Sequence, residues 1–271
     1  MSHFTVAIIG TNVEEQLEPF NENIVMEKYV KFTKEALIAD ERKNLEDYKN
    51  GIYACYLIDP VEYKKNCANP THLQYLEDFP KLLEASDEDI YNKAIHWYDP
   101  EDITENGSVL STYNPKSKWD WYQIGGRWSG MLKLKNSVEH VDSANMDAID
   151  WEALHLPSSE IKKLERKYLL LTKKVEPVTE EEKEMADNLF YKPEYYIERY
   201  GTPEAYAIAN SSFHTFAILK DGEWFEEGEM GMFGSSSETP EEGLRWETDF
   251  YKTFIENLPD DEIITIVDCH I

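Results

Sequence analysis

The ten residues WDWYQIGGRW, from Trp119 to Trp128, gather side chains that suit ligand binding. Three of the seven tryptophans fall within this motif, beside one arginine and two adjacent glycines. Aromatic faces stack on a nucleobase or fill the centre of a protein interface, and an arginine fork binds carboxylate or phosphate. The glycines permit close approach of a backbone or a ligand. The residues nominated for ligand or partner binding are Trp119, Asp120, Trp121, Tyr122, Gly125, Gly126, Arg127 and Trp128.

The motif also has a purely structural interpretation. If it is one strand, alternation places Trp119 and Trp121 on one face, and Asp120 and Tyr122 on the other. The tryptophans then fill a core between sheet and helix, and Asp120 forms a structural ion pair with Arg127 at a bulge. The sequence leaves both the binding role and the core role open.

Charge around the motif favours a small anionic ligand. Residues 111–135 hold five basic side chains and one acidic one, a net charge of +4, whereas the whole chain carries −27. Such an island can steer a small anion such as a nucleotide, although the chain as a whole repels a polyanion. We therefore expect no binding to free nucleic acid or to an anionic membrane surface.

The C-terminal fifth is the opposite pole. Residues 221–271 contain fifteen acidic and two basic side chains, a net charge of −13. A dense acidic face can occupy a basic groove on a partner protein, and it can equally be a solvated surface. The residues nominated for an acidic interface are Glu226, Glu227, Glu229, Glu241 and Glu242.

The two ends of the chain supply a third candidate. Asp268 and His270 alternate onto one face of a terminal strand, and His3 lies on the first strand. If these strands pair, the three groups can approach as a metal or acid–base site, although the spacing is generic. The histidine spacings elsewhere do not match a zinc hydrolase. We predict no metal and no cofactor. If a metal binds at all, His3, Asp268 and His270 are its candidate ligands.

Composition limits the class of protein. The chain of 271 residues is 41% hydrophobic and 13% aromatic, enough to build a globular core. Three cysteines without C-x-x-C spacing disfavour a disulfide framework and indicate a reducing cytoplasm. We expect neither a signal peptide nor a membrane span.

The expected fold is α+β, a mostly antiparallel sheet that includes both terminal strands, with helices packed largely on one face. Residues 1–271 are expected to form a single domain with a helical insertion at about 152–210. We predict strands over residues 3–9, 52–58 and 263–271, a hairpin over 213–226, and helices over 27–49, 71–84, 86–98 and 240–258. A turn or bulge at Gly125-Gly126 is expected to join two β segments of residues 118–135.

Three stretches together resemble an uncharacterised family of small proteins encoded by bacteriophages and prophages. They are the start MSHFTVAIIG, the centre KWDWYQIGGRWSG and the end LPDDEIITIVDCHI, which closes on VDCHI, and they cover about a quarter of the chain. The resemblance implies a viral origin and expression in the cytoplasm of a bacterial host. It implies no particular reaction.

The preferred functional hypothesis is therefore a non-enzymatic phage accessory protein that binds and inhibits a host factor, such as an anti-phage defence component. Its partner would be a host bacterial protein with a basic surface. The alternative is a nucleotide-signal sponge or a nucleotide-processing enzyme that uses the Trp119–Trp128 motif. A metal enzyme at the chain ends is a third hypothesis, and assembly into a homo-oligomer is left open.

Overall fold

The computed structural model describes residues 2–231 and 235–271, and the chain divides into two compact units. One unit is Val25–Asn114, and the other joins Met1–Ile24 to Pro115–Ile271. The expectation of a single domain over residues 1–271 differs from this division into two compact units. The reason is that the helices of Val25–Asn114 bury their apolar side chains in two clusters of their own.

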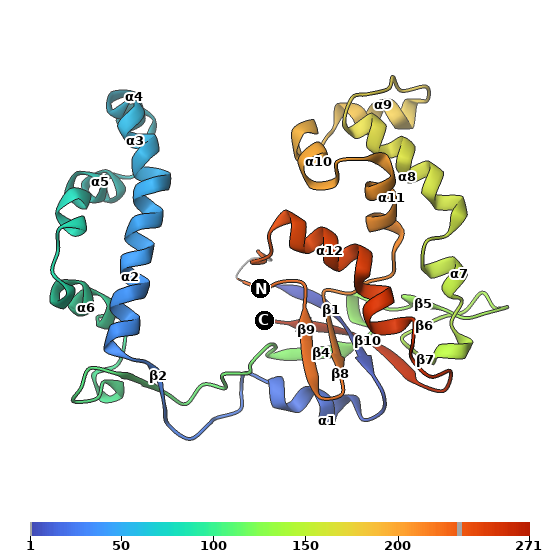
Figure 1. Cartoon of the computed structure of the whole chain (residues 1–271), viewed down its shortest axis with the longest axis horizontal. Helices are drawn as coiled ribbons and strands as arrows, with labels where there is room; N and C mark the ends of the chain where they lie inside the picture. The colour runs from blue at the N-terminus through green and yellow to red at the C-terminus, as the bar shows by residue number, and fades with distance from the viewer. Residues whose placement is uncertain (1, 232–234) are drawn as a thin grey trace. The chain divides into compact units, whose positions relative to one another are not determined.

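The larger unit is built on one six-stranded sheet (Figure 1). Its strands follow the order β4-β10-β1-β8-β9, and β7 also pairs with β10. The β1–β8 pair is parallel and the other pairs are antiparallel. The strands are β1 (His3–Ile9), β4 (Trp121–Ile124), β7 (Ser143–Asn145), β8 (Ala217–Lys220), β9 (Glu223–Glu226) and β10 (Ile263–His270).

Both ends of the chain lie in the middle of this sheet. Strands β1 and β10 are neighbours, and His3 is directly opposite His270. The backbone N–H of Ser2 donates to the carbonyl of Ile271 over 3.0 Å, so the two ends lie side by side (Figure 1). The predicted α+β class, with both terminal strands in one mostly antiparallel sheet, is confirmed.

The two faces of the sheet carry separate cores because side chains alternate along a strand. On one face, Ala7 and Ile266 pack with α7 (Trp151–Leu154) and α12 (Pro240–Phe250). On the other face, Val6 and Val267 pack with the smaller α1 (Val13–Leu17) and the 3₁₀ turn that follows it. Figure 1 shows α12 and α1 on opposite sides of the sheet.

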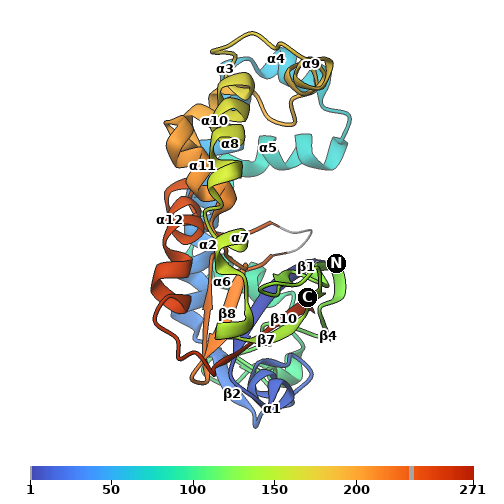
Figure 2. The same cartoon turned by 90° about the vertical axis from the view of Figure 1, so that its right-hand side faces the viewer.

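A helical layer within the larger unit matches the helical segment predicted at about 152–210. Tyr168, Leu171 and Tyr206 form its buried cluster, where α8 packs on α11. Figure 2 shows these helices gathered together. They are α8 (Ser158–Leu171), α9 (Glu180–Asp187), α10 (Pro193–Tyr200) and α11 (Pro203–Ser211).

The smaller unit is mainly helical and corrects two predictions. The helix expected over residues 27–49 begins only at Lys34, because Tyr29–Phe32 is a strand that pairs with Val109–Ser111. Residues 52–58, predicted as a strand, continue the long helix α2 through a π-helical turn into α3. A short apolar run does not distinguish a strand from a buried helix, and here Tyr53 packs on Phe79, with ring centroids 4.7 Å apart. The elements are β2 (Tyr29–Phe32), α2 (Lys34–Tyr48), α3 (Ala54–Ile58), α4 (Pro60–Asn66), α5 (Pro70–Leu83), α6 (Asp87–Ile95) and β3 (Val109–Ser111).

Local turn and cap signals predicted their elements well. The β8–β9 hairpin turns at Asp221 and Gly222, whose φ angles of 54° and 76° are those of a type I′ turn. Helix α12 begins with a capping box between Thr239 and Glu242, and a π-helical turn ends it. By contrast, β4 does not form a hairpin with the next strand, because β5 (Leu132–Lys133) pairs with β6 (His140–Val141) instead.

Candidate functional site

Two histidines from opposite ends of the chain meet on one face of the sheet. His3 on β1 and His270 on β10 are register partners, so their side chains point to the same side. Their ring centroids are 4.9 Å apart and the rings are edge to face, at 73°. The side chains are 19% and 12% exposed respectively, which leaves part of each imidazole open to solvent.

His3 is oriented by Asp268, two residues before His270 on the neighbouring strand. The Nδ1 atom of His3 lies 2.8 Å from Oδ1 of Asp268, a carboxylate that is almost wholly buried. The other oxygen, Oδ2, accepts a hydrogen bond of 3.0 Å from the backbone N–H of Arg127. Because an ionised carboxylate can only accept, His3 donates from Nδ1, which leaves Nε2 with the free lone pair in the neutral ring.

His270 has a separate carboxylate partner. Its Nδ1 atom lies 2.6 Å from Oδ1 of Asp120, which directly precedes β4. The Asp120 side chain is 32% exposed, so this pair is more open to water than the His3–Asp268 pair. Each imidazole is thus fixed in orientation by its own aspartate, and neither Nε2 forms a hydrogen bond within the part of the chain that the structure describes.

Gly126 allows the buried carboxylate to reach the turn that follows β4. Its φ is 53°, and a Cβ atom added there would lie 2.4 Å from Cβ of Asp268. At Gly125, an added Cβ would lie 2.3 Å from a carboxylate oxygen of Asp142. The close approach predicted for the glycine pair is therefore present, and the neighbours that approach are two aspartate side chains.

Trp121 provides an exposed ring beside His3, and Arg127, whose side chain is exposed, bonds Asp268 through its backbone N–H. The Trp121 side chain is register partner of His270 and is 48% exposed, and its ring centroid lies 6.2 Å from that of His3. Arg127 is exposed, and no carboxylate of residues 2–231 or 235–271 forms an ion pair with its guanidinium. The predicted Asp120–Arg127 pair is therefore wrong, because Asp120 bonds His270 instead.

The remaining aromatic residues of the motif belong to the core. Trp119 is buried on the opposite face of the sheet, where its ring packs on Tyr122 at 5.1 Å and its Nε1 donates to the carbonyl of Leu17 over 3.1 Å. The prediction that Trp119 shares a face with Trp121 is wrong because β4 begins only at Trp121. Trp128 packs against the core under α12.

The metal candidates lie together without forming a ligand set. His3, Asp268 and His270 are adjacent, but Asp268 uses its two oxygens on His3 and on the turn backbone. Within residues 2–231 and 235–271, no group of three His, Cys, Asp or Glu side chains is placed to hold a metal ion. Two oriented imidazoles suit proton transfer instead, one as acceptor and one as donor.

The sequence did not reveal that Asp120 is the partner of His270, because only strand pairing brings them together.

Three of the five predicted acidic interface residues are engaged within the protein. Glu226 pairs with Lys118 at 2.6 Å, Glu242 caps α12, and Glu227 is half-buried among other carboxylates. Glu229 and Glu241 are exposed. The Glu226–Lys118 pair also neutralises part of the predicted basic island, as does the pair of Lys133 with Asp150 at 2.9 Å.

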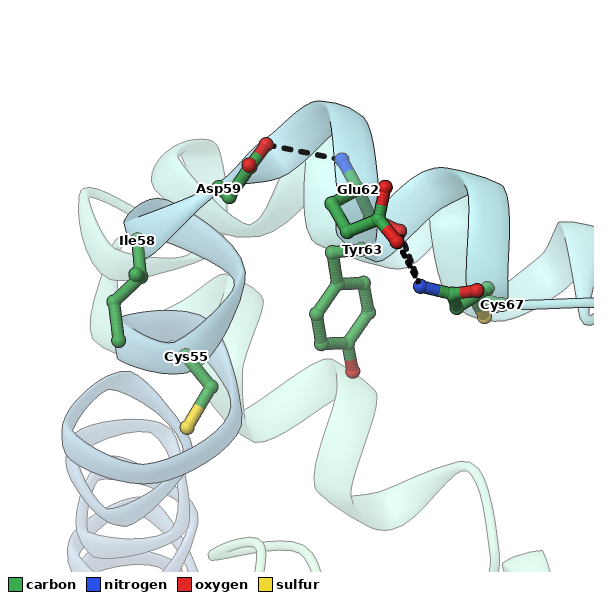
Figure 3. A pocket seen from close by; sticks show the side chains of 7 residues that line it. Cys55, Ile58, Asp59, Glu62, Tyr63 and Cys67 are labelled. Atoms are coloured by element: carbon green, nitrogen blue, oxygen red, sulfur yellow. Dashed lines mark hydrogen bonds between the residues drawn. The ribbon is translucent and has the colours of Figure 1, made fainter.

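The smaller unit contains a pocket of about 520 Å³ whose lining differs from that of the histidine site (Figure 3). Cys55 and Cys67 line it, together with Ile58 and Glu62. Its polar side chains are used locally: Asp59 caps α4, and Glu62 accepts a hydrogen bond of 2.9 Å from Asn66. This hollow therefore lacks the converging donors and bases of the histidine site.

Comparison with known proteins adds no assignment. No protein-family profile, no curated protein and no solved structure matches the chain, so the resemblance to phage-encoded proteins stays a prediction. In the described part of the chain, none of the helices has the length and apolar character needed to cross a membrane.

Proposed function

We propose that the protein is an acid–base enzyme acting on a small phosphate-bearing ligand with a flat ring, such as a nucleotide. His3 and His270 are the proton-transfer groups. The observation that carries this proposal is that each of the two adjacent imidazoles has its own aspartate at Nδ1. A carboxylate at Nδ1 fixes the tautomer and orientation, as general acid–base catalysis requires.

Cleavage of a phosphate ester uses two such groups in one step. A neutral imidazole takes the proton from the attacking hydroxyl or water, whose oxygen forms the new bond to phosphorus. A protonated imidazole gives its proton to the leaving oxygen as the old bond to phosphorus breaks. The proton count balances across the step, and the two rings exchange protonation states. Exposed Trp121 offers a face for stacking. The exposed guanidinium of Arg127, which forms no ion pair with a carboxylate of the described residues, offers a partner for phosphate.

The test is a panel of mononucleotides, dinucleotides and cyclic oligonucleotides, followed by thermal shift for binding and by ³¹P NMR for turnover. We expect one class to stabilise the protein and to be converted. His3→Asn and His270→Asn should lower conversion by about 100-fold or more while binding persists, and Arg127→Ala should weaken binding. His96→Asn, at an exposed histidine in the smaller unit, is the matched control and should change neither. If no member of the panel binds and none is converted, the proposal is overturned.

A further inference from the structure

A second pocket lies along α12, and its lining includes neither His3 nor His270. Its volume is about 330 Å³. Aromatic rings of Trp246 and Phe254 form part of its wall, with centroids 5.6 Å apart. The indole is held in place because its Nε1 donates to the carbonyl of Thr215 over 2.7 Å. The pocket therefore has a fixed aromatic surface.

Carboxylates dominate the rim of this pocket. Glu227, Glu242 and Asp249 line it, against one basic side chain, Arg245. Asp249 is exposed, and one oxygen of Glu242 caps the helix. Carboxylates beside aromatic faces attract an organic cation through charge and through the negative face of the rings.

Further negative charge lies directly behind Glu227. Glu247 of α12 and Glu238, which precedes that helix, both face it, and Arg199 of α10 is the facing cation. Arg199 is already committed to Glu247 at 2.7 Å. One buried oxygen each of Glu238 and Glu247 has no hydrogen-bond partner among the described residues. Three carboxylates against one guanidinium leave this wall of the pocket short of positive charge.

We propose that the pocket along α12 receives an arginine side chain from a basic segment of a partner protein. Charge complementarity selects the occupant: an acidic rim, an undercompensated carboxylate wall and a fixed indole match a guanidinium, which forks to carboxylates and stacks on aromatic rings. A lysine has the charge but lacks the planar fork. This partner site is independent of the acid–base proposal, and it gives part of the acidic C-terminal region a specific occupant.

The proton on Glu227 makes the site dependent on pH. Burial, together with the charges of Glu247 and Glu238, raises the pKa of Glu227 to about 7, and Arg199 opposes this increase. Ionised Glu227 attracts a guanidinium and protonated Glu227 does not. Apparent affinity for arginine should therefore rise with pH, by up to about tenfold between pH 6 and pH 8 if binding requires the ionised form.

The experiment uses the full chain and the pentapeptide Gly-Gly-Arg-Gly-Gly, blocked at both ends. Its twin carries citrulline, which has the same shape without the charge. The readout is the indole ¹H–¹⁵N peak of Trp246 in a titration. We expect a saturable shift with the arginine peptide and none with the citrulline peptide. Equal shifts with both peptides, or none with either, would overturn the proposal.

Two variants sharpen the test. Asp249→Asn should weaken arginine binding about threefold, because it removes one rim charge, whereas Glu241→Gln, on the same helix but outside the pocket, should leave it unchanged. Glu227→Gln should remove the difference between pH 6 and pH 8. A pH difference that persists in Glu227→Gln, or equal effects of Asp249→Asn and Glu241→Gln, would count against the assigned pocket.

Discussion

The imidazole rings of His3 and His270 lie edge to face, 4.9 Å apart, although 266 residues separate them in the sequence. Antiparallel pairing of β1 with β10 makes them register partners, and the adjacent β4 adds Asp120. Three strands from distant parts of the chain thus build one site. The centre of the sheet positions the site more firmly than a loop would, since the backbone of each histidine is held by a strand partner.

Removing an aspartate should impair catalysis less than removing its histidine. Asp120→Asn keeps a side chain that can accept from Nδ1 of His270 but removes the negative charge that stabilises the protonated ring. We expect turnover of the nucleotide identified in the panel to fall about 10- to 100-fold, against about 100- to 10,000-fold for His270→Asn. Initial rates over a range of pH test this. Full activity of Asp120→Asn at every pH would contradict the assigned role.

Gly126→Ala should destabilise the larger unit. The new Cβ would lie 2.4 Å from Asp268, and the positive φ strains any other residue. We expect a loss of about 2–4 kcal/mol in the free energy of unfolding. Gly222→Ala is the matched control, because its φ of 76° is also positive but no atom lies within 4 Å of the added Cβ. Its loss should be about 1 kcal/mol, so the difference between the variants measures the collision.

These unfolding free energies can be measured by urea denaturation followed by tryptophan fluorescence. Six of the seven tryptophans belong to the larger unit, and Trp97 is the single one within Val25–Asn114. The signal therefore reports mainly on the unit that contains the substitutions. If Gly126→Ala and Gly222→Ala were equally stable, the contact between Gly126 and Asp268 would carry no energetic weight.

Trp119 and Trp121 should respond in opposite ways to truncation. Trp119 is 6% exposed in the core, so Trp119→Ala should cost about 3–5 kcal/mol of unfolding free energy. Trp121 is 48% exposed, so Trp121→Ala should cost less than about 1 kcal/mol and should instead weaken nucleotide binding. Urea denaturation and thermal shift with the ligand separate the two effects. A large stability loss in Trp121→Ala would show that this ring is structural.

Local signals in the sequence predicted much of the fold. The Asp221-Gly222 turn and the capping boxes at Ser86 and Thr239 depend on residues close in sequence, so their elements were predicted correctly. The strand predicted over residues 52–58 failed, since a run of apolar residues suits either structure and the packing against Phe79 decides it. The separate unit Val25–Asn114 was missed because its boundaries carry no break in composition that marks them.

The candidate site was predictable only in part. Alternation along a strand correctly placed Asp268 and His270 on one face, and pairing of the terminal strands added His3. The pairing of Asp120 with His270 was not predictable, because it requires knowing that β4 lies beside β10 and begins only at Trp121. Because the start of β4 at Trp121 was not known, Trp119 was also predicted on the wrong face of the sheet.

The raised pKa of Glu227 makes stability fall as pH rises. The pKa of Glu227 is about 7 in the folded protein, whereas the ordinary value is 4.5. As pH rises, the unfolded chain therefore loses this proton at a lower pH than the folded protein does. The stabilising contribution is therefore complete below about pH 4.5 and is lost as pH rises through 7. A shift of this size corresponds to at most about 3 kcal/mol of unfolding free energy, and solvent at this half-buried side chain reduces it to about 1–2 kcal/mol.

Glu227→Gln carries no titrating proton at this position. Between pH 4.5 and pH 8, the unfolding free energy of the wild type should therefore fall by about 1–2 kcal/mol relative to that of this variant. Parallel stability curves for the two proteins, measured by urea denaturation across that range, would show that Glu227 titrates as an ordinary exposed glutamate.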